Sequence, residues 1–450
     1  MRRPLAAAAI AVAAALSFVW YFGSPLQTTP GFFIDESSIA YNAWSIAQGG
    51  VDEHGVRMPV YFAAFGEYKN PVYIYLLALV FKGFGPSILA ARALSIVLGF
   101  LAAVCLALLA RDVPARAFTF LAAIATPWLF ETSRLVFEVA AFPLALALAL
   151  LCVRTQRHPV LCALGFALVT YTYTAGRFLG PAMAVALLLV MPWRRALIAW
   201  GAYAVLLIPA LLNFRALTAR VAEVGLAKPS YFAAFSPGFL FVTGDANPRH
   251  HIAFGGMLLV TVGLAALVGI GAAIRSRDPW SRYLLAMLVL TPVPGALAPE
   301  APHALRLVAL GVVLVVFAGI GVSTLATIPR EALRAALTIA LFLALAAEGL
   351  AFRAQYRELG PLRVDDFDAA YPYAFSAALR MQKPPLCVEE SPYYIHAYWY
   401  GVLHGVDRAQ LPRADEGTEP RGRVCVGSAP VCASCRVLTD ARGFVAYRRE

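Results

Sequence analysis

The chain has 450 residues, of which 60% are hydrophobic and only 14% are charged, whereas an ordinary soluble domain has about 25% charged residues. This composition excludes a soluble globular protein, and the recurring apolar segments predict a polytopic α-helical membrane protein. The net charge of +11 does not indicate nucleic-acid binding, because the arginines stand in small groups between apolar runs, as in the cytoplasmic loops of membrane proteins.

The first apolar run, Pro4 to Ser24, follows two arginines and predicts the first membrane span. It continues through Trp20 and Phe22 without the small, polar residues of a cleavage site, so we expect an uncleaved helix rather than a signal peptide. A large first extracytoplasmic loop, residues 25–86, is expected to follow. It contains an amphipathic stretch, Ser37 to Ala47, which predicts a helix.

One short apolar stretch, Val72 to Phe84, decides the topology. A span needs about 20 apolar residues, so we interpret this stretch as interfacial. The later arginine clusters then all fall on the side of the amino terminus, as the positive-inside rule requires. We therefore expect about eleven spans in a transmembrane domain of residues 1–352. After the first loop, the apolar runs are 87–110, 117–130, 135–153, 159–174, 178–193, 196–212, 252–274, 283–297, 307–328 and 335–352.

Two polar regions are expected outside the membrane besides the first loop. The second long loop, residues 213–251, is typical of a mobile lid or a connector. The tail, residues 353–450, is long enough for a small extracytoplasmic α/β domain. Its pattern predicts a helix at Phe367–Met381. The predicted strands lie at 386–388, 423–426 and 444–447.

Four cysteines lie in this tail: Cys387, Cys425, Cys432 and Cys435. The last two form a C-x-x-C pair that resembles half of a zinc site, but no histidine nearby completes it. An oxidising location favours two disulfides instead, and the spacing does not reveal how the four cysteines pair.

Two adjacent carboxylates, Asp35 and Glu36, follow the first apolar run. One of them could be a general base that deprotonates an acceptor, while the other orients it or binds a metal. The structural alternative is that Asp35 caps a helix running from Glu36 to Ala47, since aspartate is a favoured N-cap. The dipeptide taken alone fits the cap better.

Four cations depart from the positive-inside pattern because they lie on the expected outer side. We interpret them as binding an anionic ligand together. They are Lys69, Arg134, Arg177 and Arg306.

The turn around Ser133 places Arg134 and Glu138 four residues apart, which predicts one shared helical face. They form either a local salt bridge or a phosphate-binding cation beside a second site carboxylate. In the next outer turn, Tyr173 and Arg177 either belong to the membrane interface or offer a hydroxyl and a cation to a sugar.

The sequence Pro302-His303-x-x-Arg306 is more specific than these turns. His303 and Arg306 are three residues apart, so they share a face at the start of the next span. Arginine binds phosphate oxygens bidentately, and a helix N-terminus adds partial positive charge. We therefore expect this turn to bind substrate.

With these motifs, the membrane part resembles bacterial C-superfamily (GT-C) glycosyltransferases of the protein O-mannosyltransferase and lipid A aminoarabinose transferase type. The matching segments are Asp35-Glu36, Glu67-Tyr68-Lys69-Asn70-Pro71, Ser133-Arg134-x3-Glu138 and Pro302-His303-x2-Arg306. Two departures concern the carboxylates. Tyr68 separates Glu67 from Lys69, which are adjacent in the aminoarabinose enzymes, and Glu138 stands where the family often has aspartate.

The resemblance implies an inverting transfer of one sugar from a polyprenyl-phosphate donor to a lipid, glycan or protein acceptor, outside the bacterial cytoplasmic membrane. Asp35 would be the general base with Glu36 in support, and Lys69, Arg134 and Arg306 would neutralise the leaving phosphate. The expected catalytic residues are Asp35, Glu36 and Glu138. The expected substrate-binding residues are Tyr68, Lys69, Arg134, Tyr173, Arg177, His303 and Arg306.

Other readings of the sequence stay open. A divalent metal ion is compatible with the family, although no residue here is assigned to it, and no other cofactor is expected. Besides membrane lipids, the expected partners are the donor and its acceptor, and not nucleic acid. One alternative function is a transporter or flippase of a lipid-linked sugar, although the chain lacks the internal repeats typical of transporters. Another is a non-catalytic partner in envelope assembly.

Overall fold

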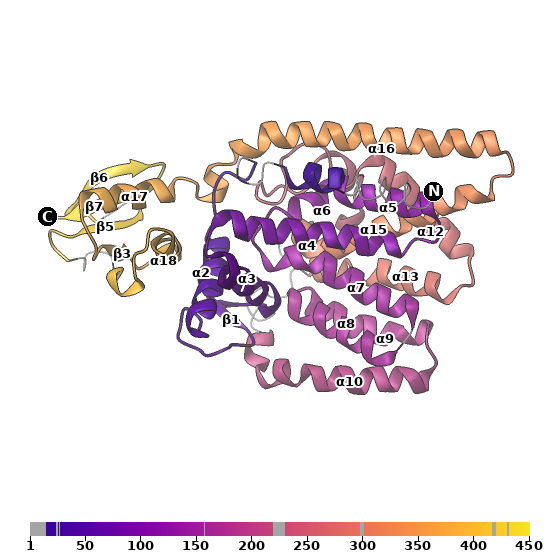
Figure 1. Cartoon of the computed structure of the whole chain (residues 1–450), viewed down its shortest axis with the longest axis horizontal. Helices are drawn as coiled ribbons and strands as arrows, with labels where there is room; N and C mark the ends of the chain where they lie inside the picture. Colours follow the sequence, from indigo (N-terminus) through magenta and orange to yellow (C-terminus); the bar gives the residue numbers. More distant parts are fainter. Residues whose placement is uncertain are drawn as a thin grey trace, which may run out of the picture.

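A computed structural model describes residues 15–23, 26, 28–156, 158–218, 230–297, 301–415, 420–429 and 432–450. Most of the predicted first span, Pro4 to Ser24, lies outside these residues, and residues 15–22 are helical. The described chain is mostly helical, with a small sheet near the carboxyl end (Figure 1).

Five helical segments among the described residues are long and apolar enough to cross a membrane. Helix α16 (Glu331–Leu359) runs along one side of the bundle (Figure 1). The five segments are Ile88–Leu108 (α4), Glu138–Thr155 (a 3-10 turn, Glu138–Ala141, followed by α7, Phe142–Thr155), Trp193–Leu212 (α10), Ala304–Thr327 (α15, Ala304–Thr324, and a 3-10 turn) and Glu331–Leu362. The shorter helices include α5 (Val113–Ala125), α6 (Pro127–Thr132), α8 (Pro159–Thr172), α9 (Gly176–Ala186), α12 (Val260–Arg275), α13 (Pro279–Leu290) and α14 (Val293–Ala296).

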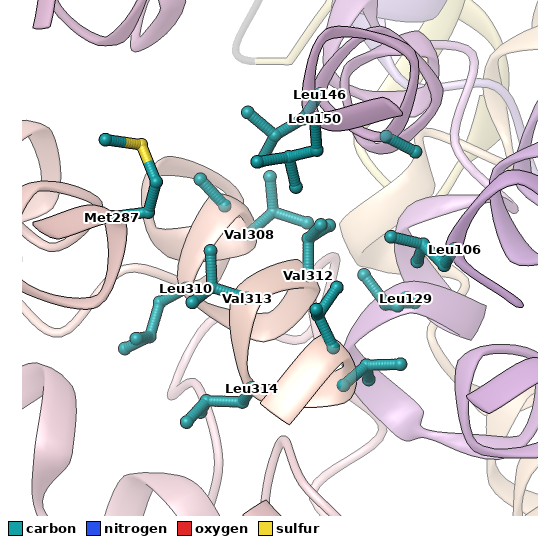
Figure 2. Close-up of a cluster of buried hydrophobic side chains, with 14 of the residues drawn as sticks. Leu106, Leu129, Leu146, Leu150, Met287, Val308, Leu310, Val312, Val313 and Leu314 are labelled. Atoms are coloured by element: carbon teal, nitrogen blue, oxygen red, sulfur yellow. The ribbon is translucent and has the colours of Figure 1, made fainter. Parts of the chain in front are cut away.

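Helix α15 forms the centre of the membrane core because it is apolar on every face. Figure 2 shows Val308 and Val312 of this helix facing leucines of α7, α6 and α4. Helix α12 packs so closely on α15 that the backbones of the two helices are in contact. A Cβ on Gly269 would lie 1.9 Å from the Phe317 carbonyl oxygen, so only glycine permits this approach.

Prolines and glycines explain where the helices depart from the predicted apolar runs. The run 117–130 is divided between α5 and α6 because Thr126, which precedes Pro127, takes an extended conformation. The run 252–274 becomes helical only at Val260, after an irregular segment in which Gly255 has a left-handed φ of 68°. The run 283–297 is divided between α13 and α14 at Pro292 and Pro294.

The first loop folds around helix α2 (Ile34–Gly49), which extends the predicted amphipathic stretch at both ends. A two-stranded antiparallel hairpin follows, formed by β1 (Phe62–Ala64) and β2 (Glu67–Lys69), with Phe62 opposite Lys69. The hairpin leads directly into α3 (Pro71–Phe84), a helix of 14 residues that is too short for an ordinary span.

Residues 364–450, here called the C-terminal module, form a five-stranded sheet with the strand order β4-β3-β5-β7-β6. Strands β3 and β5 are parallel, whereas β7 is antiparallel to both of its neighbours. The predicted helix at 367–381 begins only at Tyr371, because residues 365–367 form a 3-10 turn. The elements are α17 (Tyr371–Met381), β3 (Cys387–Glu389), α18 (Tyr394–Leu403), β4 (Arg413–Ala414), β5 (Val424–Ser428), β6 (Cys435–Ala441) and β7 (Phe444–Arg449).

The four cysteines of the module form two disulfides, as the sequence predicts. Cys387 of β3 is bonded to Cys425 of the neighbouring strand β5. Cys432 is bonded to Cys435, so the C-x-x-C pair is a disulfide and not part of a zinc site. The bond between β3 and β5 joins two chain segments that are 38 residues apart.

The C-terminal module packs directly on the first loop, beside α2 and α3 (Figure 1). The ring of Trp399 in α18 stacks on Phe32 and on Phe81, with a centroid distance of 5.7 Å to each. Tyr394 donates a hydrogen bond of 2.9 Å to the Glu53 carboxylate of the first loop. The module and the first loop therefore share one hydrophobic core.

Candidate active site

A cavity of about 690 Å³ lies between the first loop, the helical bundle and the segment that precedes α12. Its walls come from α2, β2, the turn at Glu138, the end of α8 and the start of α15. Among the residues that the sequence predicts for the site, the cavity is bordered by Asp35, Tyr68, Lys69, Glu138, Tyr173, Arg177, His303 and Arg306. Glu36 and Arg134 do not border it.

Asp35 lies within the first turn of α2, whose N-cap is Phe33. The sequence-based alternative that Asp35 is itself the N-cap is therefore wrong, because the helix begins two residues earlier than that alternative requires. The Asp35 carboxylate is 31% exposed and forms an ion pair with the ammonium group of Lys69 at the end of β2. It is thus fixed in position and still accessible from the cavity.

Lys69 is 5% exposed and charged. Burial alone would lower the pKa of Lys69, but Asp35 and Glu138 act in the opposite direction and hold this pKa above its ordinary value. Glu138 also accepts a hydrogen bond from the backbone N–H of Asn70, which follows Lys69. The two carboxylates therefore hold a buried cation at one end of the cavity.

Arg177 is occupied by scaffold contacts. Its guanidinium donates to the Asn70 side-chain oxygen at 3.0 Å and to the Leu217 carbonyl at 2.9 Å, and it also reaches the Tyr68 carbonyl at 3.2 Å. These bonds join the hairpin, the start of α9 and the chain that follows α10. Arg177 borders the cavity, but its donors face protein oxygens and fix the loop that carries Lys69.

Arg249 and Arg306 are the freer cations of the cavity. Within the described residues, neither has a carboxylate partner within 4.0 Å. Arg249 lies over the ring of Phe33, 4.1 Å from its centroid, and donates to the Asn247 side chain at 3.3 Å. Guanidinium groups without a carboxylate partner can bind an anion, phosphate above all, and both of these border the cavity.

Tyr173 borders the cavity near Arg306 and the two carboxylates. Burial raises the pKa of Tyr173, nearby Arg306 opposes the shift, and Glu138 and Asp35 add to it. The phenol is therefore neutral and can donate a hydrogen bond to a bound ligand. Its ring packs on Phe142, with the centroids 5.5 Å apart.

The expectation that Arg134 and Glu138 share a helical face is wrong. Helix α6 ends at Thr132, and residues 133–137 are not helical, so the spacing of four residues does not align the two side chains. The Arg134 guanidinium is buried, where it lies 3.8 Å from the centroid of the Phe130 ring and donates to the Ser133 hydroxyl at 2.7 Å. It cannot bind a phosphate in the cavity from there.

Glu36 is fully buried and lies behind the site rather than within it. Its carboxylate pairs with Arg92 and accepts backbone hydrogen bonds from Phe33 at 2.9 Å and from Val136 at 2.8 Å. Phe33 lies just before Asp35, and Val136 lies just before Glu138. Glu36 therefore joins the two segments that carry the cavity carboxylates.

Sequence reasoning missed Arg249, His250 and Asn247 as cavity residues. The sequence assigned the whole segment 213–251 to a lid or connector, and residues 219–229 of it lie outside the described part. The adjacent basic residues Arg249-His250-His251 were the available signal, but no periodicity indicated which of them would face the cavity.

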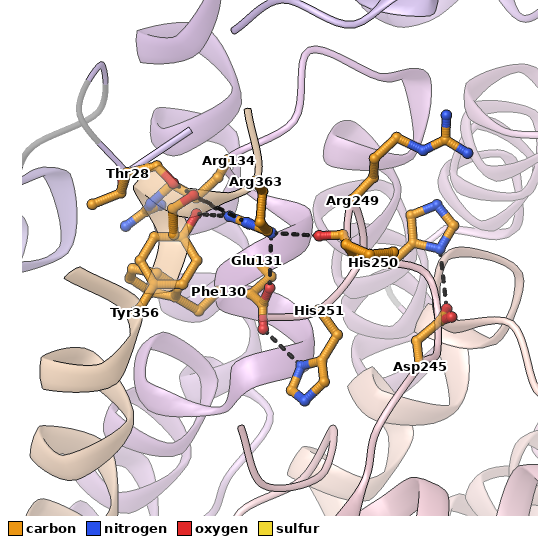
Figure 3. A network of polar contacts seen from close by, with 12 residues as sticks. Thr28, Phe130, Glu131, Arg134, Asp245, Arg249, His250, His251, Tyr356 and Arg363 are labelled. Atoms are coloured by element: carbon orange, nitrogen blue, oxygen red, sulfur yellow. Dashed lines mark hydrogen bonds and ion pairs between the residues drawn. The ribbon is translucent and has the colours of Figure 1, made fainter. Parts of the chain in front are cut away.

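A polar network holds the segment that contains Arg249 and His250 in place (Figure 3). His251 is buried, and its two ring nitrogens lie 2.8 Å from the Glu131 carboxylate and 3.0 Å from the Gly255 carbonyl. Because both partners only accept, both nitrogens carry protons. Burial alone would lower the pKa of His251, but Glu131 and the Gly255 carbonyl raise it above its ordinary value.

Arg363 completes the network from the chain that follows α16. It donates to the Pro248 carbonyl at 2.8 Å, and one of its nitrogens lies 3.7 Å from the Glu131 carboxylate. Contacts at Pro248 and His251 thus bracket Arg249 and His250, which border the cavity (Figure 3). Glu131 is the shared anion of the network, and it is only 2% exposed.

Glu131→Gln is expected to destabilise the protein strongly. The substitution leaves the buried Arg363 and the imidazolium of His251 without a carboxylate, and breaking a buried ion pair costs about 3–5 kcal/mol. Thermal unfolding in detergent measures the effect. The matched control is Glu331→Gln, which removes an ion pair whose carboxylate is 88% exposed and is expected to leave the unfolding temperature unchanged. Equal effects of the two substitutions would contradict the role given to Glu131.

Three potential metal ligands meet where this segment reaches α15. The carboxylate of Asp245 and the imidazoles of His250 and His303 place their ligand atoms within 4.8 Å of one another. Asp245 accepts a hydrogen bond of 2.7 Å from the backbone N–H of Ala304, which holds it at the helix start. No residue was expected to bind a metal, and no sequence motif indicates this cluster, whose members Asp245 and His303 are 58 residues apart in the chain.

Known proteins are similar to this chain in fold, whereas no similarity in sequence is detected. No protein-family model and no curated protein sequence matches it. The structure of ArnT from Cupriavidus metallidurans bound to undecaprenyl phosphate matches with a TM-score of 0.62 and 14% identity, over 98% of each chain. The structure of the same protein in the apo state matches with a TM-score of 0.63 and 14% identity, over 99% of this chain and 98% of ArnT.

An archaeal enzyme matches over a smaller share of its length. Oligosaccharyltransferase AglB from Archaeoglobus fulgidus, in complex with an inhibitory peptide and a dolichol-phosphate, gives a TM-score of 0.54 and 12% identity. The match covers 89% of this chain and 64% of AglB. The expected resemblance to lipid A aminoarabinose transferases is confirmed at the level of fold, because the chain shares the overall fold of ArnT and of AglB.

Proposed function

We propose that the protein is an inverting glycosyltransferase that moves one sugar from a polyprenyl-phosphate-linked donor to a lipid, glycan or protein acceptor. One observation carries the proposal. A single cavity brings the accessible carboxylate of Asp35 together with Lys69, Arg249 and Arg306. The fold neighbour ArnT supports the lipid donor, since its structure was determined with undecaprenyl phosphate bound.

The cavity residues divide the chemistry between them. The acceptor hydroxyl oxygen forms a bond to the anomeric carbon of the sugar while its proton passes to Asp35. The bond from that carbon to the phosphate oxygen breaks on the opposite face, so the configuration inverts. The polyprenyl phosphate leaves with added negative charge, which Arg249, Arg306 and Lys69 neutralise.

Contacts between the loops at the far end of the bundle support an outward-facing cavity. There, Arg111 pairs with Asp278 at 3.1 Å, and Arg195 donates to the Gln156 carbonyl at 2.9 Å. These connections carry the arginine clusters, which the positive-inside rule assigns to the cytoplasm. The cavity and the C-terminal module then face the outer side of a bacterial cytoplasmic membrane, in a topology of about eleven spans.

A divalent metal ion fits the Asp245–His250–His303 cluster. One carboxylate and two imidazoles are a usual zinc donor set that keeps a position open. The Nδ1 atom of His303 is buried without a hydrogen-bond partner among the described residues. Burial, His250 and Arg306 lower the pKa of His303 to about 3, so the ring is neutral, as a metal ligand must be. A bound ion would supply fixed positive charge beside the phosphate site.

Zinc titration of the purified protein, followed by calorimetry, tests this cluster. We expect one bound ion per chain, and we expect His303→Ala to weaken binding by at least about tenfold, since even outer-shell substitutions cost 10–100-fold. His404, an exposed histidine at the end of α18, provides the control substitution His404→Ala. Equal zinc affinity in wild type and His303→Ala would remove His303 from the metal site.

A further inference from the structure

The helix that carries Asp35 has no cap from its N-cap side chain, and its only local side-chain acceptor among the described residues, Glu36, binds the backbone N–H of Phe33. Its N-cap residue is Phe33, whose side chain makes no capping hydrogen bond. The first amide groups of a helix need acceptors that the helix itself does not provide. The backbone N–H of Ile34 finds its acceptor in the carboxylate of Asp368, at 3.0 Å, from the C-terminal module. Asp368 lies 334 residues further along the chain and replaces the missing cap.

His396 fixes this carboxylate and binds the same turn of α2. Its Nε2 lies 3.2 Å from the Asp368 oxygen that receives the Ile34 amide, and its Nδ1 lies 2.7 Å from the Ser37 hydroxyl. Because a carboxylate only accepts, Nε2 carries the proton of this bond. The pair therefore contacts α2 one residue before Asp35 and two residues after it.

The hydroxyl of Ser37 and the imidazole of His396 have no access to substrate. Ser37, His396 and Asp368 form a serine–histidine–aspartate chain of hydrogen bonds, but Ser37 and His396 are 0% exposed. A buried serine cannot attack an external substrate, so the chain is not a nucleophilic centre. Asp368 and His396 instead contact the Ile34 backbone amide and the Ser37 hydroxyl, in the turn that carries Asp35.

The surrounding packing makes this contact rigid. A Cβ on Gly31 would lie 2.1 Å from the Phe367 carbonyl oxygen, so the chain just before α2 lies directly against the chain just before Asp368. His396 is packed under the ring of Tyr371, with the centroids 4.7 Å apart. The position of the Asp35 turn is thus set from the C-terminal module as well as by Lys69.

We propose that Asp368 and His396 are positioning residues for Asp35, so that the C-terminal module takes part in catalysis by fixing the general base. This inference rests on the proposed transferase function. Asp368 and His396 act through the first turn of α2 and make no contact with the reacting atoms. The module therefore has a role in the reaction that is separate from any binding of the acceptor.

The test compares three full-length variants. Asp368→Ala removes the acceptor for the Ile34 amide, and Asp368→Asn keeps an acceptor oxygen. Tyr394→Phe removes the hydrogen bond to Glu53 and serves as the matched control in the same interface. We expect Asp368→Ala to lower kcat for transfer from a polyprenyl-phosphate sugar by about 10–100-fold, the scale of small misplacements of a catalytic group.

The pattern across variants separates positioning from simple docking. We expect the KM for donor to stay within about twofold in Asp368→Ala, and Asp368→Asn and Tyr394→Phe to keep near-wild-type kcat, because the Ile34 amide retains its acceptor. A wild-type kcat in Asp368→Ala, or the same loss in Tyr394→Phe, would overturn the proposal.

Amide hydrogen exchange of the peptide that contains residues 34–37 gives a readout independent of activity. Exchange is expected to accelerate in Asp368→Ala and to stay unchanged in Tyr394→Phe. If the wild-type protein transfers no sugar, the proposed function fails, and this exchange comparison still decides the positioning. Unchanged exchange in Asp368→Ala would show that Asp368 does not hold the turn.

Discussion

Asp35→Asn is expected to lower kcat for sugar transfer by about 10²–10⁴-fold, the usual contribution of a general base. Asparagine keeps the size of the side chain but cannot take the proton of the acceptor hydroxyl. It also removes one of the two carboxylates that act on Lys69, which is 5% exposed, so more of the lysine charge is available to the phosphate. Binding of undecaprenyl phosphate is therefore expected to stay at wild-type strength or to become tighter.

Two further substitutions make this result specific. Asp35→Glu keeps the carboxylate but displaces it, and we expect it to retain more activity than Asp35→Asn. Asp365→Asn removes a carboxylate that is 78% exposed in the C-terminal module, and we expect wild-type transfer. Steady-state kinetics with protein in detergent measures all three variants. Wild-type kcat in Asp35→Asn would remove this residue from the chemistry.

Arg249→Ala and Arg306→Ala are each expected to weaken undecaprenyl phosphate binding by about 10–100-fold. A hydrogen bond to a charged group contributes about 1.5–3 kcal/mol, and 1.4 kcal/mol corresponds to a factor of ten in Kd. Because both guanidiniums border one cavity and lack carboxylate partners among the described residues, no protein carboxylate must be released before phosphate binds. We expect the double variant to lose measurable binding.

The control is an arginine at the other end of the bundle. Arg330 precedes α16 and is exposed, and Arg330→Ala is expected to bind undecaprenyl phosphate as the wild type does. Arg134→Ala tests whether Arg134 contributes to phosphate binding. Since Arg134 is buried against Phe130, its removal should lower stability while the folded protein keeps its phosphate affinity. Equal affinity in Arg249→Ala, Arg306→Ala and wild type would locate the phosphate elsewhere.

The sequence predicted those parts of the site that lie in short, recognisable turns. Asp35, Lys69, His303 and Arg306 lie beside helix starts or hairpin ends, where a charged residue next to an apolar run needs an explanation. The cavity brings all four together. Their roles in catalysis stay predictions, because the geometry shows proximity and access but not reaction.

The errors arose where local spacing was read as helix. Arg134 and Glu138 have the spacing of a helical pair, but residues 133–137 leave the helix, and the arginine becomes buried against Phe130. Asp35 has the residue type of an N-cap, but α2 begins at Ile34. In both cases tertiary contacts outweighed a local preference: Arg134 is buried against Phe130, and the Ile34 amide at the start of α2 donates to Asp368.

Other features could not be placed from the sequence. Arg249 stands in a basic run within a long polar segment without periodicity, and only the fold shows that it borders the cavity and lies over Phe33. Asp368 and His396 lie more than 300 residues beyond the helix that they hold. A single sequence reveals segments and motifs, whereas such long-range contacts require the fold.

The most direct test of the account follows a radiolabelled polyprenyl-phosphate sugar in sealed membrane vesicles that contain the wild-type protein. We expect the label to leave the lipid and become covalently attached to an acceptor, and to stay on the lipid in vesicles with Asp35→Asn. Label that crosses the membrane while still attached to the lipid, at equal rates in both proteins, would contradict the account and identify a flippase instead.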